Sequence, residues 1–235
     1  SSIYILNDYL DRESDKLHPK KQFRPIASGK VPVKAALVLM VVLVSCSMLL
    51  AAPLPTEFTA VLCLYGLINI TYCFYTKDIS ILDVISVASG FVLRVEAGAM
   101  LIGVNASVWL LLCTGFIALF MAFAKRRDDI IKNLDVSHRP SLKGYNRTFL
   151  DICCTVCLTS VLICYALYTN DDQTKLMISP DLYLTIPFVV VGVFRYMQIT
   201  FVEKTSGDPT QIVTSDKVIL SSLALWGATI LYILF

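Results

Sequence analysis

The sequence predicts an all-α protein whose hydrophobic helices form a polytopic membrane bundle. Of its 235 residues, 56% are hydrophobic, and the mean hydropathy is +0.69. Soluble domains are usually only about 45–50% apolar. Seven apolar runs are long enough for a helix to cross the hydrocarbon core of a bilayer, which takes about 20 residues. The charged residues are concentrated between these runs, so the net charge of +2 does not indicate a nucleic-acid partner, and we expect none.

The apolar runs give the order of the predicted helices. Residues 1–7 are apolar up to a polar block, so we expect them to be the last turns of an earlier helix. We therefore predict one transmembrane domain over residues 1–235 that is incomplete at its N-terminus. The predicted spans are 33–54, 57–75, 79–103, 107–124, 149–168, 183–202 and 217–235.

Lysine and arginine are distributed very unevenly between the two sets of loops that these spans define. One set carries 16 Lys and Arg, and the other carries only Lys175. Cytoplasmic loops are enriched in Lys and Arg. We therefore expect a multi-pass protein of the inner (plasma) membrane with its charged loops on the cytoplasmic face. These loops are residues 8–32, 76–78, 125–148 and 203–217.

The segment from Asn7 to Lys30 is the strongest candidate for a functional site. Its first half places Asn7, Asp11 and Asp15 four residues apart, which puts them on one face of a helix, with Asp8 at the edge of that face. Its second half is basic and is interrupted by Pro and Gly. Carboxylates that hold a metal, followed by cations that neutralise phosphate, are typical of a Mg²⁺–diphosphate site. The alternative is an ordinary solvated loop of mixed charge.

A second charged segment begins at Lys125-Arg126-Arg127 and runs to residue 148. Its seven cations exceed what membrane orientation needs, and they suit a second phosphate-bearing group. Simple anchoring by positive charge remains the alternative for any one of them.

Arg94, Glu96 and Arg195 lie well inside predicted spans, where charges usually pair with each other or line a cavity. One interpretation is that Glu96 pairs with Arg94 or with Arg195. The other is that Arg195, in the cytoplasmic half of its span, binds a polar headgroup. Lys77 lies at the membrane interface and is expected near the mouth of a site.

The motif Asn7-Asp8-x-x-Asp11-x-x-x-Asp15 resembles the first aspartate-rich motif of the UbiA superfamily of intramembrane prenyltransferases, and residues 72–77 resemble its tyrosine–lysine element. The resemblance covers essentially the whole chain. It implies a fold of nine transmembrane helices around a central cavity, of which about seven and a half are present here.

The chain departs from most members of that superfamily in its second charged segment. Asp128 is followed four residues later by Lys132, where most members have a second DxxxD motif. The pattern of cations at this place resembles that of the decaprenyl-phosphate phosphoribosyltransferase branch. Further stretches that resemble this branch are His18 to Gly29, Ala88 to Arg94, Lys125 to Arg127, Arg139 to Leu142 and Gly207 to Thr210.

The resemblance implies a Mg²⁺-dependent transfer of 5-phosphoribose from 5-phosphoribosyl diphosphate to a polyprenyl (decaprenyl-type) phosphate, for the synthesis of cell-envelope polysaccharide precursors. In the implied site, Asn7 and Asp11 bind the metal, and Asp8, Asp11 and Asp15 are catalytic. The implied substrate-binding residues are Tyr4, Lys21, Arg24, Lys77, Lys125, Arg126, Arg139 and Arg195.

Two other functions stay open at this point. A conventional prenyltransferase would use a polyprenyl diphosphate donor and an aromatic acceptor, and the missing second DxxxD motif argues against it. A transporter or lipid-binding protein would spread ionisable residues through the middle of the membrane, whereas here they crowd the segments between spans. A homo-oligomer is compatible with either enzyme.

Overall fold

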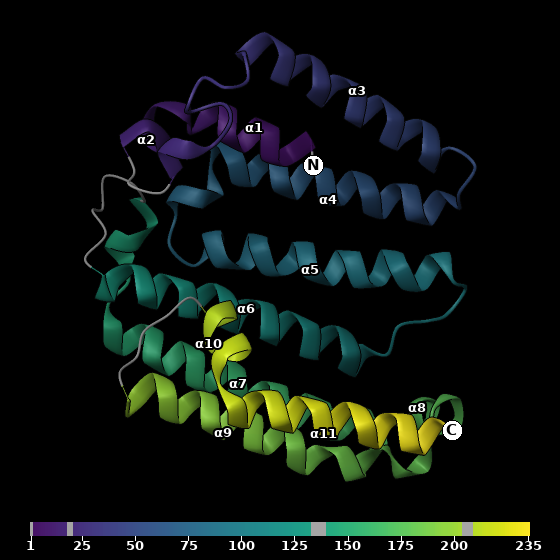
Figure 1. Cartoon of the computed structure of the whole chain (residues 1–235). Helices are drawn as coiled ribbons and strands as arrows, with labels where there is room; N and C mark the ends of the chain where they lie inside the picture. The colour runs from purple at the N-terminus through teal and green to yellow at the C-terminus, as the bar shows by residue number, and fades with distance from the viewer. Residues whose placement is uncertain (1, 18–20, 133–139, 204–208) are drawn as a thin grey trace. The chain divides into compact units, whose positions relative to one another are not determined.

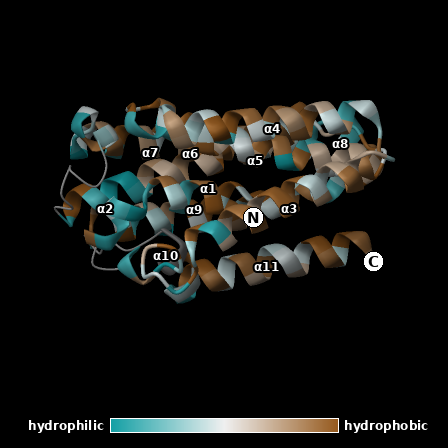
Figure 2. Ribbon diagram, turned by 90° about the horizontal axis from the view of Figure 1, so that it is seen from above, coloured by the Kyte–Doolittle hydropathy of each residue, from teal (hydrophilic) through white to brown (hydrophobic). Residues whose placement is uncertain are grey.

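Helices form every regular element of the computed structural model, which describes residues 2–17, 21–132, 140–203 and 209–235 (Figure 1). No strand occurs within these ranges. Seven of the helices are long and apolar enough to cross a membrane, which confirms the seven predicted spans. Their sides are mostly apolar and exposed, as is plain for α3 and α11 in Figure 2, and such faces suit contact with lipid.

The chain divides into two compact units, and the first contains residues 1–104 together with 135–144. Within it, α1 packs against both α3 and α4, and α4 packs against α5. Pro32 and Pro55 directly precede α3 and α4, where a residue without an N–H costs the helix no hydrogen bond. The elements of this unit are α1 (Ser2–Leu10), α2 (Arg12–Leu17), η1 (Lys21–Phe23), α3 (Val33–Ala51), α4 (Thr56–Phe74), η2 (Thr76–Asp78), α5 (Leu82–Leu101) and η4 (Pro140–Gly144).

The short helix η4 packs on the turn that begins α5. The Ser80 hydroxyl donates to the Ser141 carbonyl at 2.6 Å, and the Ser141 hydroxyl donates to the Asp83 carboxylate at 3.1 Å. Asp83 and Ser141 are fully buried. A Cβ on Gly144 would lie 2.2 Å from the Ser80 oxygen, so only glycine allows this close approach. Asp83 therefore contributes to packing here.

The second unit contains residues 105–134 and 145–235. In it α6 packs along α7, α9 packs on α7 and on α11, and η5 contacts α7, α8, α9 and α11. Tyr165, Thr185 and Trp226 join three of these elements, since the Tyr165 hydroxyl bonds to Thr185 Oγ1 and accepts from Trp226 Nε1, each at 2.7 Å. The elements are α6 (Val108–Ile131), α7 (Arg147–Asn170), α8 (Asp172–Met177), η5 (Pro180–Thr185), α9 (Ile186–Phe201), α10 (Pro209–Ser215) and α11 (Lys217–Leu234).

Helix α6 is longer than the sequence predicted. The prediction ended it at residue 124 and placed Lys125–Arg127 in a loop, but the helix continues to Ile131. Partners within the second unit make this extension stable. The buried Arg127 pairs with Asp151 of α7, donates to the Thr200 carbonyl at 3.2 Å and lies over the Phe201 ring. The Lys132 ammonium pairs with Asp128 one turn earlier.

Asp216 caps α11 and pairs with Arg195. Its carboxylate accepts from the backbone N–H groups of Val218 and Ile219, each at 3.0 Å, and from Arg195 Nε and Nη2 at 3.1 and 2.9 Å. These hydrogen bonds, with Arg195 the largest cause, lower the pKa of Asp216 below 3.8.

We predict that Asp216→Ala lowers the free energy of unfolding by about 1–2 kcal/mol through loss of the cap. Asp216→Asn keeps a capping side chain and loses only the ion pair, so it should cost less, about 0.2–1 kcal/mol. Because the folded-state pKa is lowered, the stabilisation by ionised Asp216 is complete above pH 3.8 and is lost as the pH falls through the lowered value. Unfolding in mixed SDS–detergent micelles as a function of pH measures both effects. A cost for Asp216→Asn that equals the cost for Asp216→Ala would contradict this account of the cap.

Candidate active site

The acidic motif lies at a break between two helices. Helix α1 ends at Leu10 and α2 begins at Arg12, so Asp11 occupies the break. The helical hydrogen bonds persist across it, since the Asp11 N–H donates to the Asn7 carbonyl at 2.9 Å and the Asp15 N–H donates to the Asp11 carbonyl at 2.8 Å. Asn7 and Asp11 contact each other directly, with 3.1 Å from Nδ2 to Oδ2. The break thus preserves the shared face that the spacing predicts.

Arg24 joins the two remaining carboxylates of the motif. Its Nη1 atom lies 2.8 Å from Asp8 Oδ1 and 2.8 Å from Asp15 Oδ2. The Asp15 side chain is only 2% exposed, so its charge depends on this partner and on Lys21, whose Nζ lies 3.8 Å away. The turn after η1 therefore folds back on the motif, as the order of acidic and basic halves suggested.

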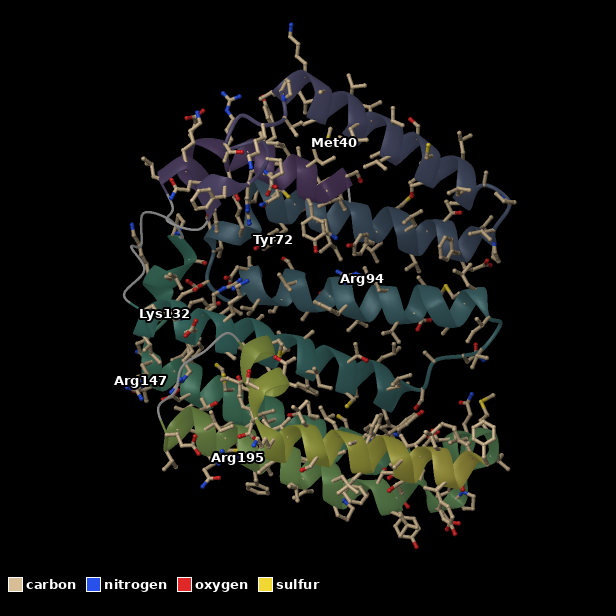
Figure 3. The ribbon with its side chains drawn as sticks, viewed as in Figure 1. Met40, Tyr72, Arg94, Lys132, Arg147 and Arg195 are labelled. Carbon is tan, nitrogen blue, oxygen red and sulfur yellow. The ribbon has the colours of Figure 1, made fainter. Side chains whose placement is uncertain are left out.

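Lys77 contacts the motif although it lies 66 positions further along the chain than Asp11. It follows α4 in η2, and its Nζ donates to Asp11 Oδ1 at 2.5 Å. Cys73, at the end of α4, contacts Asn7 Oδ1 through its sulfur at 3.9 Å. The motif is thus enclosed between the basic turn and the end of α4. Figure 3 labels Tyr72 at this end of the helix.

Three carboxylates and three cations pair within this cluster, which we define as Asp8, Asp11, Asp15, Lys21, Arg24 and Lys77. The pKa of Asp8 is raised above 3.8, chiefly because burial disfavours its charged form. Arg24 and Lys21 lower this pKa, while the neighbouring Asp15 and Asp11 raise it. A further positive charge beside the motif would therefore stabilise the ionised form of Asp8.

The cluster has the ligands for Mg²⁺, although its geometry is that of paired ions. Within the described ranges no three His, Cys, Asp or Glu residues are grouped ready to hold a metal. Mg²⁺ needs fewer, because it typically takes one or two carboxylates and completes its shell with water and substrate phosphate. Asp11, Asp8 and the Asn7 amide offer hard oxygen ligands. Because the charges of the cluster are balanced, binding a strongly anionic substrate here requires added positive charge. Mg²⁺ would supply that charge, and the oxygen ligands present fit it.

Two cations of the cluster have unused donors. Arg24 bonds through Nη1 alone, which leaves Nε and Nη2 without a partner among the described residues. Lys77 has one bond, to Asp11, and an ammonium carries three N–H donors. Both side chains can therefore donate to a phosphate oxygen while they remain near the carboxylates.

The other predicted substrate-binding residues lie in varied surroundings. Tyr4 is 71% exposed on α1, three and four residues before Asn7 and Asp8 and so on the same face. In the second unit Lys125 is exposed and Arg126 is 3% exposed. Arg139 lies outside the described residues.

Arg195 has carboxylate partners of its own. It pairs with Asp216 and also with Glu203 at 2.7 Å, as its position in Figure 3 near the start of α11 suggests. The proposed pairing of Glu96 with Arg94 or Arg195 is wrong. Arg195 is held by Asp216, directly before α11, and by Glu203, after α9. The Arg94 guanidinium lies over the rings of Tyr65 and Phe91.

The contact of Cys73 with the motif is not among the predictions from the sequence, because a cysteine in an apolar run usually packs as a small apolar residue. The signal was present, since Asn69, Cys73 and Lys77 follow each other at intervals of four.

The chain matches known proteins along nearly its full length. The sequence model of the UbiA prenyltransferase family matches residues 1–223. The decaprenyl-phosphate phosphoribosyltransferase of Corynebacterium glutamicum is 34% identical over 232 residues, which cover 96% of this chain and 69% of that protein. The protein of the same name from Mycolicibacterium smegmatis is 32% identical over 240 residues, with 98% and 75% covered.

A solved structure has the same fold. The UbiA homolog from Archaeoglobus fulgidus bound to GPP and Mg²⁺ superposes with a TM-score of 0.73 at 20% identity, and the match covers 97% of this chain and 82% of that one. The match includes residues of both units and confirms the predicted helical architecture.

Arg24→Gln should destabilise the folded protein by about 2–3 kcal/mol, because it leaves the buried Asp15 without its main partner. Thermal or SDS-induced unfolding in detergent measures this loss. The matched control is Glu13→Gln on the helix that carries Asp15. The partners of Glu13, Arg12 and Lys16, are exposed, so this variant should unfold like wild type.

The double variant Arg24→Gln/Asp15→Asn removes both charges and should recover part of the loss. If it is as unstable as the sum of the two single variants, the ion pair does not couple these residues.

Proposed function

This chain belongs to the UbiA prenyltransferase family, and we propose that it transfers 5-phosphoribose from 5-phosphoribosyl diphosphate to a polyprenyl phosphate and releases diphosphate. The observation that carries this proposal is the similarity, over almost the whole chain, to two relatives named decaprenyl-phosphate phosphoribosyltransferase. The cluster of paired ions beside membrane-crossing helices supports it, because both substrates bear phosphate and one bears a long lipid.

The leaving diphosphate binds at the cluster. Asn7 and Asp11, with Asp8 beside them, would hold Mg²⁺, which supplies positive charge to the diphosphate when it is bound. The C-terminal end of α1 adds a negative potential that favours a cation here. Arg24 donates to phosphate oxygens through Nε and Nη2, and Lys77 and Lys21 bind the same group. Tyr4, on the same face of α1, contacts the bound donor.

The reaction breaks the bond between the anomeric carbon of the ribose and the diphosphate. Positive charge develops on the ribose as this bond lengthens, and the carboxylates of Asp8, Asp11 and Asp15 offset it. The lipid phosphate attacks the same carbon. It needs positioning more than a general base, because its second pKa is about 6 and it is largely ionised near neutral pH.

The remaining phosphate groups need cations beyond the cluster. We assign them Lys125, Arg126, Arg139 and Arg195, the basic residues that follow or end the later spans. The excess of Lys and Arg in these loops supports a reaction at the cytoplasmic face of the plasma membrane. The product is a lipid-linked phosphoribose, suited to supply a sugar precursor for cell-envelope polysaccharide.

Asp11→Asn tests the proposal together with the metal. Liposomes with the full-length protein, labelled 5-phosphoribosyl diphosphate, Mg²⁺ and decaprenyl phosphate should yield labelled lipid. We expect EDTA to abolish the product and excess Mg²⁺ to restore it. Asp11→Asn should lower the rate on the order of 100-fold or more, because it removes both a metal ligand and transition-state charge.

Glu57→Gln is the control, since Glu57 is exposed at the far end of α4 and should not affect the rate. Absence of labelled lipid, together with prenyl transfer from a polyprenyl diphosphate to an aromatic acceptor, would overturn the proposal in favour of a conventional prenyltransferase.

A further inference from the structure

Arg94 is an unpaired cation inside a membrane-crossing helix. It lies in α5, is exposed, and has its guanidinium 4.5 Å from the centre of the Phe91 ring and 5.4 Å from that of Tyr65 on α4 (Figure 3). It makes no hydrogen bond or ion pair with the residues that the structure describes. Its five N–H donors are therefore satisfied by no described protein group.

The obvious partner for this charge is not used. Glu96 follows two residues later, which places it about 200° around the helix, on the opposite side. Its buried Oε2 has no hydrogen-bond partner either. Charged side chains in a membrane rarely face lipid and usually pair or line a polar cavity. Because the available acid points away, the position of Arg94 favours an anion that comes from outside the protein.

The Arg94 side chain extends toward the cluster end of the unit. Side chains of a helix slant toward its N-terminus, and the guanidinium accordingly lies beside Phe91 and Gly90, one turn before Arg94. From Gly90 to Asp83, at the start of α5, is a rise of about 10 Å. Helix α5 begins directly after η2, which carries Lys77. Along the axis of α5 the guanidinium thus lies about 10 Å from the helix start, which follows the turn that carries Lys77.

Polar side chains on α4 connect the two places. Tyr65, Asn69 and Cys73 follow each other at intervals of four on α4 and so share one face, and Lys77 follows in η2. At one end Tyr65 contacts Arg94, and at the other Cys73 and Lys77 contact Asn7 and Asp11. Between them, half-buried Asn69 donates to the Tyr65 carbonyl at 2.7 Å and keeps its side-chain oxygen free.

We propose that Arg94, together with Tyr65 and Asn69, forms a binding site for a phosphate monoester within the membrane span. The planar guanidinium can bind two phosphate oxygens while it stacks on the rings. The proposal rests on the function above, in which two substrates carry such a group: the donor at its 5-phosphate and the acceptor at its lipid phosphate. Either one, bound at Arg94, would hold its substrate at a second point and align it with the cluster.

Binding and turnover with three variants test this site. Arg94→Gln removes the charge, Arg94→Lys keeps it without the fork, and Glu96→Gln is the control on the opposite face of α5. Binding is measured in detergent by thermal stabilisation with ribose 5-phosphate and, separately, with decaprenyl phosphate. We expect one of these ligands to bind Arg94→Gln on the order of 10- to 100-fold more weakly than wild type. The affinity of Arg94→Lys should lie between those of wild type and Arg94→Gln. The affinity of Glu96→Gln should equal that of wild type.

The kinetic constants identify the phosphate. A raised KM for 5-phosphoribosyl diphosphate alone assigns Arg94 to the donor, and a raised KM for decaprenyl phosphate alone assigns it to the acceptor. Equal binding of both ligands by wild type and Arg94→Gln, or binding of neither by wild type, overturns the site even if turnover is found. If binding depends on Arg94 but the wild type transfers no phosphoribose, the site stands and the proposed function fails.

Discussion

The hydrocarbon core of a bilayer provides no hydrogen-bond partners, and this constraint decides where each polar group of the chain can lie. Backbone groups bond within helices, which is why every described element is helical. Charged side chains lie near helix ends and have counter-ions, as Arg24 does with Asp8 and Asp15, Arg127 with Asp151, and Arg195 with Asp216. Among the described residues, Arg94 and Glu96 of α5 are charged groups inside a span that have no ion-pair partner, and charges of this kind are usually functional.

The same constraint explains why the cluster is built from matched ions. Without bound substrate, three unpaired carboxylates at the membrane interface would repel each other and lose hydration. In this state Arg24, Lys21 and Lys77 pair with them, and the backbone hydrogen bonds across Asp11 fix their spacing. A phosphate-bearing substrate can then exchange with pairs already formed, so that binding costs little reorganisation.

The sequence was sufficient to predict the membrane helices and the acidic face, because both depend on local periodicity. It placed the seven spans, and its spacing argument brought Asn7 next to Asp11. It failed where the deciding partner is distant in the chain. Asp151 and the Thr200 carbonyl bind Arg127 and so stabilise the extension of α6, and Asp216 forms an ion pair with Arg195. Nothing near Arg94 in the sequence reveals that an aromatic ring on another helix, rather than Glu96, would be its neighbour.

The docking of η4 on the start of α5 has a consequence for biogenesis. Residues 140–144 complete a unit whose other elements end near residue 104, and the contact of Ser80 with Ser141 spans 61 positions. A chain emerging from the ribosome supplies α6 before it supplies η4, and domains generally fold as units during synthesis. The turn that carries Lys77 therefore lacks its final packing partner until α6 has been made. A chain that stalls within α6 would leave the buried Asp83 carboxylate without its hydrogen bond from Ser141.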